Sequence, residues 1–175
     1  VQAFLRFRED VLEKKVDAAV FGVISDHRYR NFPHPYRMKA HLSPDWYRIG
    51  VEQVPHARFN RRGDIEIVFT PIWQPSILKN DFDVFLPDEH MLDLVTVGMF
   101  KEIDNFSKEN HVPVIFALLD QLDARFNQMM TSTFSIAHDV STPYNEVYTF
   151  IPADIHPNPQ ANQCFAQRLL PIIKD

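Results

Sequence analysis

Apolar runs alternate along the chain with amphipathic segments of helical period. Residues 18–24 and 112–119 are apolar at nearly every position, which is typical of strands covered on both faces of a parallel sheet. Apolar residues recur every three or four positions in 2–14 and in 92–106, so the pattern predicts an amphipathic helix before each strand. The stripe of the first helix holds Phe4, Leu5, Val11 and Leu12.

The remaining segments are predicted from turn and cap residues. Alternation of Ile65, Ile67 and Phe69 after the Arg62-Gly63 turn predicts an inserted β-hairpin at 57–71. The polar segment 25–46 is expected to be a long loop, 120–130 a helix, 131–145 a polar stretch and 146–151 a short strand. Asn158 and Pro159 are typical of a helix start, and the buried stripe of this last helix would hold Phe165, Ala166, Leu169 and Leu170.

This alternation of strands and helices predicts the α/β class, as a sandwich with a mostly parallel sheet. The 175 residues are 45% hydrophobic, enough for a core, and no internal boundary is visible, so we expect a single domain over 1–175. A net charge of -5 argues against nucleic acid as a partner. No apolar run approaches the roughly 20 residues of a membrane span.

Two further composition features exclude classes of site. The single cysteine, Cys164, cannot form an intramolecular disulfide or a cysteine zinc site. Four scattered glycines argue against a phosphate-binding loop. We therefore expect neither a cofactor nor a metal. The alternative of zinc held by two or three of His27, His34, His41 and His56 with Asp26 or Asp45 is weaker than the interpretation of scattered surface histidines, because the spacings match no metal motif.

The segment that carries the most chemistry is 148–158. It places Asp154 and His156 between the predicted strand 146–151 and the last helix, where open α/β sheets collect active-site groups. A histidine there can take a proton from a hydroxyl nucleophile while a carboxylate orients its ring. The competing interpretation is that Asp154 and His156 only cap the last helix and fill a polar turn.

The run Pro-Ala-Asp-Ile-His-Pro-Asn at 152–158, followed by a helix with Ala161, Phe165 and Ala166, resembles the last conserved block of SGNH (GDSL-type) hydrolases. Residues 16–31 are similar to the third block of that family, its central strand and following loop. The predicted hairpin at 57–71 is similar to an insertion in some bacterial members. Only the match of 152–158 to the last conserved block is specific.

The resemblance implies a flavodoxin-like α/β/α sandwich that hydrolyses or transfers acyl esters through a Ser-His-Asp triad. His156 would be the general base and Asp154 its orienting carboxylate. Ala153 stands where the commoner family pattern has the aspartate, and Asp154 matches a related arrangement, two residues before the histidine. The implied substrate is a small-molecule or carbohydrate ester, with acetylated polysaccharide, lipid and small esters all left open. An extracytoplasmic location is compatible with the family.

The segment that resembles the third block also contains candidate site residues, for which the support is weaker. Ser25-Asp26 stands where the family has Asn-Asp, so Ser25 is a candidate oxyanion donor through its hydroxyl or amide. Asp26, His27 and Asn31 are candidates for substrate contact, with a solvated polar loop as the other interpretation.

The family's Gly-Asp-Ser nucleophile block is not found ahead of the first helix. We expect the serine to come from an N-terminal segment outside these 175 residues, which would make them the latter part of the domain. Ser25 itself as nucleophile is the less favoured alternative. The sequence also allows a function of another class, in which the chain is a noncatalytic SGNH-like module that binds a glycan or a protein.

Overall fold

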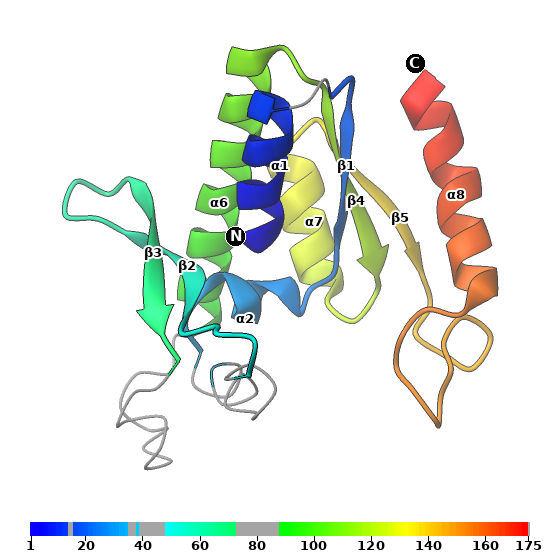
Figure 1. Cartoon of the computed structure of the whole chain (residues 1–175). Helices are drawn as coiled ribbons and strands as arrows, with labels where there is room; N and C mark the ends of the chain where they lie inside the picture. The colour runs from blue at the N-terminus through cyan, green and yellow to red at the C-terminus, as the bar shows by residue number, and fades with distance from the viewer. Residues whose placement is uncertain (14–15, 35–37, 39–47, 73–87, 175) are drawn as a thin grey trace. The chain divides into compact units, whose positions relative to one another are not determined.

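The computed structural model describes residues 1–13, 16–34, 38, 48–72 and 88–174 (Figure 1). These residues form two compact units. One contains Val1–Val16 and Asp26–His111, and the other contains Asp17–Ser25 and Val112–Asp175. None of the described helices is both long and apolar enough to cross a membrane.

The second unit is built on a parallel three-stranded sheet, which confirms the α/β class. The strand order is β1 (Ala19–Val23), β4 (Val114–Asp120), β5 (Ala137–Thr142), and both neighbouring pairs are parallel. Both apolar runs form strands, β1 and β4, as predicted. The expectation that both strands are covered on both faces is wrong for β1, where Val20 is 46% exposed. The middle strand β4 is the most deeply buried, with Phe116, Ala117 and Leu118 at 0% exposure, as expected for a strand with a neighbour on each side.

The predicted strand at 146–151 is wrong. The third strand is β5, which lies within the stretch expected to be only polar. Its polar Ser141 and Thr142 are nevertheless buried, and the Arg168 guanidinium donates hydrogen bonds to the carbonyls of Val140 and Ser141. The ladder and the Arg168 contacts thus satisfy backbone carbonyls of a strand whose buried positions include polar residues. Apolar alternation is therefore missing from the sequence of β5.

Two helices pack against β5. α7 (Ala124–Thr133) begins later than predicted, because the Asp123 carboxylate caps it by accepting the Phe126 N–H at 3.0 Å. α8 (Pro159–Lys174) begins where Asn158 and Pro159 predicted. The predicted stripe of α8 is only partly correct, since Phe165 is buried but Ala166 and Leu170 are exposed.

In the first unit, α1 (Gln2–Glu13) packs on α6 (Glu89–Asn110). Phe4 and Phe7 of α1 are buried and meet the ring of Phe106 edge-on. Both helices were predicted, but the predicted stripe of α1 omitted Phe7 and included Leu12, which is exposed. The error arises because α1 is only 12 residues long and presents a narrow aromatic face.

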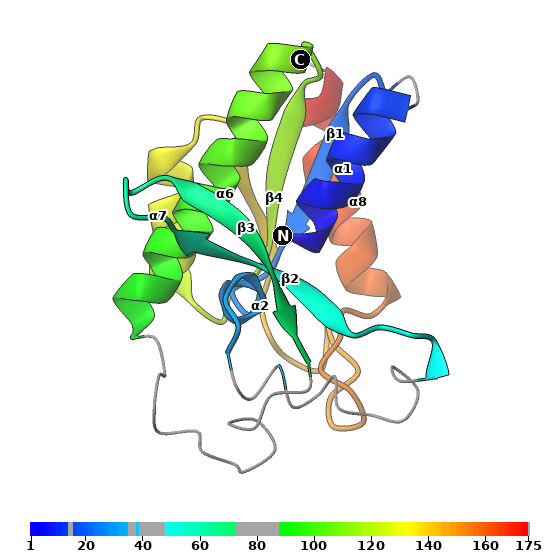
Figure 2. The same cartoon turned by 60° about the vertical axis from the view of Figure 1, so that its left-hand side comes forward.

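The predicted hairpin is confirmed as β2 (Gln53–Phe59) and β3 (Ile65–Pro71), joined by a turn in which Gly63 has φ of 85°. β2 starts earlier than residue 57, where the hairpin was expected to begin. The hairpin lies across α6 (Figure 2). Contact is close at Gly98, where an added Cβ would lie 2.5 Å from Cγ1 of Ile65.

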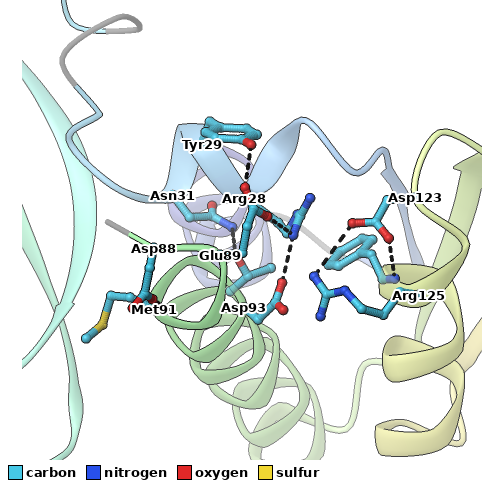
Figure 3. A network of polar contacts seen from close by, with 11 residues as sticks. Arg28, Tyr29, Asn31, Asp88, Glu89, Met91, Asp93, Asp123 and Arg125 are labelled. Atoms are coloured by element: carbon cyan, nitrogen blue, oxygen red, sulfur yellow. Dashed lines mark hydrogen bonds and ion pairs between the residues drawn. The ribbon is translucent and has the colours of Figure 1, made fainter. Parts of the chain in front are cut away.

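A buried ion-pair network joins α6 to a short helix, α2 (His27–Asn31), in the segment expected to be loop. Arg28 of α2 is 5% exposed and donates to Glu89 at 2.7 Å and to buried Asp93 at 2.9 Å (Figure 3). The Tyr29 hydroxyl donates to the other oxygen of Glu89 at 2.8 Å. These contacts explain why a polar sequence forms a helix here: its charge pairs with acids far away in the chain.

We expect Arg28→Met to lower the free energy of unfolding by about 3–5 kcal/mol, because it removes the buried guanidinium that donates to the Asp93 carboxylate. Arg30→Ala is the matched control on the same helix. Its exposed pair with Asp26, at 3.3 Å, is worth about 0.5 kcal/mol or less. Urea denaturation of both variants measures the difference, and equal losses would contradict a special role for the buried network.

Candidate active site

The candidate site lies in the connection between β5 and α8, residues 143–158, rather than in a tight turn directly after a strand. Asn158 holds this connection at its end. Its amide nitrogen donates to the carbonyls of Val147 at 2.8 Å and Thr149 at 3.2 Å. Its side-chain oxygen accepts the amides of Gln160 at 3.0 Å and Ala161 at 3.1 Å. One side chain thus caps α8 and fixes the path of the segment before it.

Backbone hydrogen bonds close the connection on itself. The backbone amide of Asn158 donates to the carbonyl of Tyr148 at 3.0 Å, and the backbone amide of Phe150 donates to the carbonyl of His156 at 3.3 Å. These two bonds flank an antiparallel bridge between Thr149 and Pro157. The intervening chain forms a turn in which the amide of Asp154 also donates to Phe150, at 3.0 Å. Asp154 and His156 therefore sit in a closed, internally bonded loop.

The structure brings the two predicted catalytic residues together. Nδ1 of His156 lies 2.5 Å from Oδ1 of Asp154, and the same oxygen accepts the backbone amide of His156 at 3.1 Å. An ionised carboxylate only accepts hydrogen bonds, so the contact favours the tautomer with the proton on Nδ1. In the neutral imidazole, Nε2 then keeps the lone pair that a general base needs.

The electrostatics of the pair suit an orienting carboxylate. The hydrogen bond from the His156 ring, with the His156 amide second, lowers the pKa of Asp154 below its ordinary value. Asp154 therefore keeps its negative charge at neutral pH. Both side chains are exposed, at 73% for His156 and 51% for Asp154. The ring is thus accessible to a reacting group.

A second carboxylate, Asp120 at the end of β4, contacts the predicted site residue Ser25, and the sequence analysis did not identify it. Its Oδ2 accepts both the amide of Ser25, at 3.0 Å, and the Ser25 hydroxyl, at 3.2 Å. Ser25 follows β1 and is buried. The pattern did contain a signal, since Asp120 directly follows the apolar run of β4, but the residue was assigned to the start of the next helix.

Burial raises the pKa of Asp120 above its ordinary value, and the two hydrogen bonds from Ser25 act in the opposite direction. Its second oxygen, Oδ1, is buried and has no hydrogen-bond partner among the described residues. A buried carboxylate oxygen without a partner disfavours the ionised form. Asp120 therefore accepts two hydrogen bonds from Ser25, while its burial makes the ionised carboxylate less favourable.

Asn127 of α7 joins the end of β4 to the middle of β5. Its amide nitrogen donates to the backbone carbonyl of Asp120 at 2.8 Å and to Oδ2 of Asp139 at 3.3 Å. The side chain of Asn127 is buried. Because both contacts reach strand residues, the carboxyl edge of this sheet is fixed by side chains as well as by the ladder.

The remaining predicted residues belong to the first unit. Asp26 precedes α2, and its carboxylate accepts from Arg30. His27 is the first residue of α2 and is half-buried. Asn31 is buried and donates to the Thr96 hydroxyl at 3.3 Å, a contact that joins α2 to α6. Roles of these three residues in substrate contact stay predictions.

The zinc alternative involves residues partly outside the described chain, because His41 and Asp45 lie there. Within the described residues, no group of three or more histidine, cysteine, aspartate or glutamate side chains is placed to hold a metal ion. Comparison with known proteins gave no match to a family model, to a curated protein or to a solved structure. The geometry and the sequence pattern therefore carry the functional argument.

The raised pKa of Asp120 predicts a pH-dependent effect of removing its charge. The folded state binds this proton more tightly than the unfolded chain, so the stabilisation from protonation is complete below the unfolded pKa of about 3.9 and is lost as pH rises through the folded pKa. Relative to wild type, Asp120→Asn should therefore gain unfolding free energy as pH rises from about 4 to 7.

Urea denaturation across this pH range measures the effect, with exposed Glu109→Gln of α6 as the control. A stability difference for Asp120→Asn that does not change with pH would contradict burial as the cause of the raised pKa. An equal change in both variants would contradict it as well.

Proposed function

We propose that this chain carries the base and its orienting acid of an SGNH-type serine hydrolase that hydrolyses or transfers acyl esters. The proposal includes the flavodoxin-like three-layer α/β/α sandwich of that family, for which the parallel sheet β1-β4-β5 is the supporting observation. The observation that carries the activity is the 2.5 Å contact between Nδ1 of His156 and Asp154. It leaves Nε2 as the proton acceptor on an accessible ring.

In the proposed reaction, Nε2 of His156 takes the proton of a serine hydroxyl as the serine oxygen attacks the ester carbonyl carbon. Asp154 stabilises the imidazolium that forms. The imidazolium then gives this proton to the departing alcohol oxygen, and the carbon–oxygen bond to the alcohol breaks. Water or a second alcohol, deprotonated by the same nitrogen, releases the acyl group from the serine. This chain supplies the base and its orienting acid in the proposed reaction.

Ser25 is the proposed oxyanion donor, and its hydrogen bonds to Asp120 affect whether it can act in this role. Both its amide and its hydroxyl donate to Asp120. A donor engaged with a carboxylate has to be released, or shared, before it stabilises a developing oxyanion. The same engagement argues against Ser25 as the nucleophile, because its hydroxyl donates to the Asp120 carboxylate, whereas the serine of a triad donates to a histidine.

His156→Ala tests the base directly in the full-length protein. The wild-type protein should react with a fluorophosphonate probe and hydrolyse a short-chain aryl ester, and the variant should lose both activities. Removing one member of a serine triad costs about 10⁴-fold or more in kcat. His90→Ala, which changes an exposed histidine of α6, is the matched control and should retain both. Unchanged labelling of His156→Ala would refute the assigned base.

If the wild-type full-length protein neither labels nor hydrolyses esters while it is folded, the noncatalytic glycan- or protein-binding module becomes the better description. Circular dichroism of the same samples establishes folding, so a misfolded sample is not counted as this outcome.

Asp154→Asn tests the orienting role separately. The amide keeps an acceptor oxygen but loses the charge that stabilises the imidazolium, so kcat/KM should fall on the order of 10²-fold, less than the roughly 10⁴-fold loss at a buried triad aspartate. The smaller loss follows from the exposure of Asp154, because water screens the pair. Glu146→Gln removes another exposed acid of the same connection and should leave kcat/KM within about twofold of wild type. Equal rates for Asp154→Asn and wild type would show that Asp154 only shapes the turn.

A further inference from the structure

The connection that carries Asp154 and His156 exposes several large apolar side chains. Scattered exposed apolar residues are ordinary on a protein surface, but residues 143–158 present a run of them: Tyr144, Val147, Phe150 and Ile155. The same segment contains two acids, Glu146 and Asp154, and no lysine or arginine. Its surface is therefore apolar and carries negative charge.

The backbone register places one of these side chains beside the base. The bonds from Asn158 to Tyr148 and from Phe150 to His156 flank the bridge between Thr149 and Pro157, so Phe150 lies opposite His156. Directly opposite residues of an antiparallel pair share a face, and successive residues alternate between faces. Phe150 is 48% exposed and the His156 side chain is 73% exposed. Phe150 and His156 thus occupy opposed positions of the bridged segments and are both accessible.

We propose that Phe150 forms an apolar subsite beside His156 that receives the acyl chain of an uncharged ester. This inference rests on the proposed function and narrows its substrate class. A serine that is hydrogen-bonded to Nε2 of His156 attacks an ester carbonyl close to the imidazole ring. The acyl chain of that ester therefore lies next to the residues that flank the ring. Covering the exposed part of the Phe150 ring with a hydrocarbon chain removes apolar surface from water, which favours longer chains.

The charge of the segment selects between possible acyl groups. A chain that ends in a carboxylate would approach Glu146 and Asp154 with no basic side chain of the connection to pair with. A neutral hydrocarbon chain meets no such cost. Ile155, between the two proposed catalytic residues, adds an exposed aliphatic side chain to this surface. These features favour an apolar acyl chain over a charged one.

The test compares kcat/KM of the full-length protein for three aryl esters: acetate, hexanoate and hemisuccinate. Wild type should prefer hexanoate to acetate by about tenfold or more, since each buried methylene contributes up to about fourfold, and hemisuccinate should be the poorest substrate. Phe150→Ser should reduce the hexanoate-to-acetate ratio about tenfold, and Phe150→Leu, which keeps an apolar side chain, by less. Leu170→Ser, at an exposed apolar residue of α8, should leave the ratio unchanged.

Equal kcat/KM for acetate and hexanoate in an active wild-type protein would overturn the subsite while the proposed function stands. A Phe150→Ser variant with the wild-type ratio would overturn it too. The use of a ratio, together with the Leu variant, separates loss of the subsite from a general loss of folded enzyme.

A binding measurement separates this inference from failure of the proposed function. Nuclear magnetic resonance of the Phe150 and His156 ring signals should show saturable shifts with 2-octanone, a neutral apolar ketone, and much weaker ones with octanoate. Shifts with 2-octanone in a protein that hydrolyses no ester would support the subsite and refute the esterase. No shifts and no hydrolysis would overturn both.

Discussion

Parallel pairing of β4 with β1 on one side and β5 on the other is the constraint on which the candidate site depends. Parallel strands end at the same edge of a sheet, so the residues that follow them are gathered there whatever their separation in the chain. Ser25 and Asp120, 95 positions apart, meet at 3.0 Å for this reason. The connection 143–158 leaves the same edge after β5, since Figure 1 shows β4 and β5 running in one direction toward it.

What the sequence predicted follows from how strongly each element is encoded locally. β1, β4, α6 and α8 carry apolar runs or cap residues, and they were predicted at or near their observed positions. β5 is encoded by its neighbours instead, because its buried Ser141 and Thr142 resemble loop residues until α8 and Arg168 cover them. α2 likewise depends on ion pairs from Arg28 to acids of α6. Such long-range contacts leave no periodic pattern in the sequence.

In the candidate site, too, the local contacts could be predicted from the sequence and the long-range contacts could not. Asp154 and His156 could be predicted because they are two residues apart and their contact forms within one turn, fixed by Asn158. Asp120 could not be assigned as a partner of Ser25 without knowing that β1 and β4 are neighbours. The surroundings of the His156 loop were predicted wrongly, because a strand was expected at 146–151. That strand would have placed the loop directly after the sheet, whereas in the structure the loop has its own bridge between Thr149 and Pro157.

The exposure of the Asp154–His156 pair connects its chemistry to the surface around it. Two charges at hydrogen-bond distance interact weakly in water and several times more strongly where the effective dielectric constant is low. In the free protein the pair is open to solvent, so water screens the interaction between the two side chains. A substrate whose hydrocarbon chain covers Phe150 would exclude water from the same face of the loop. Recognition of an apolar acyl chain and activation of the base would then be one event, because the group that is bound is also the group that lowers the dielectric constant around His156.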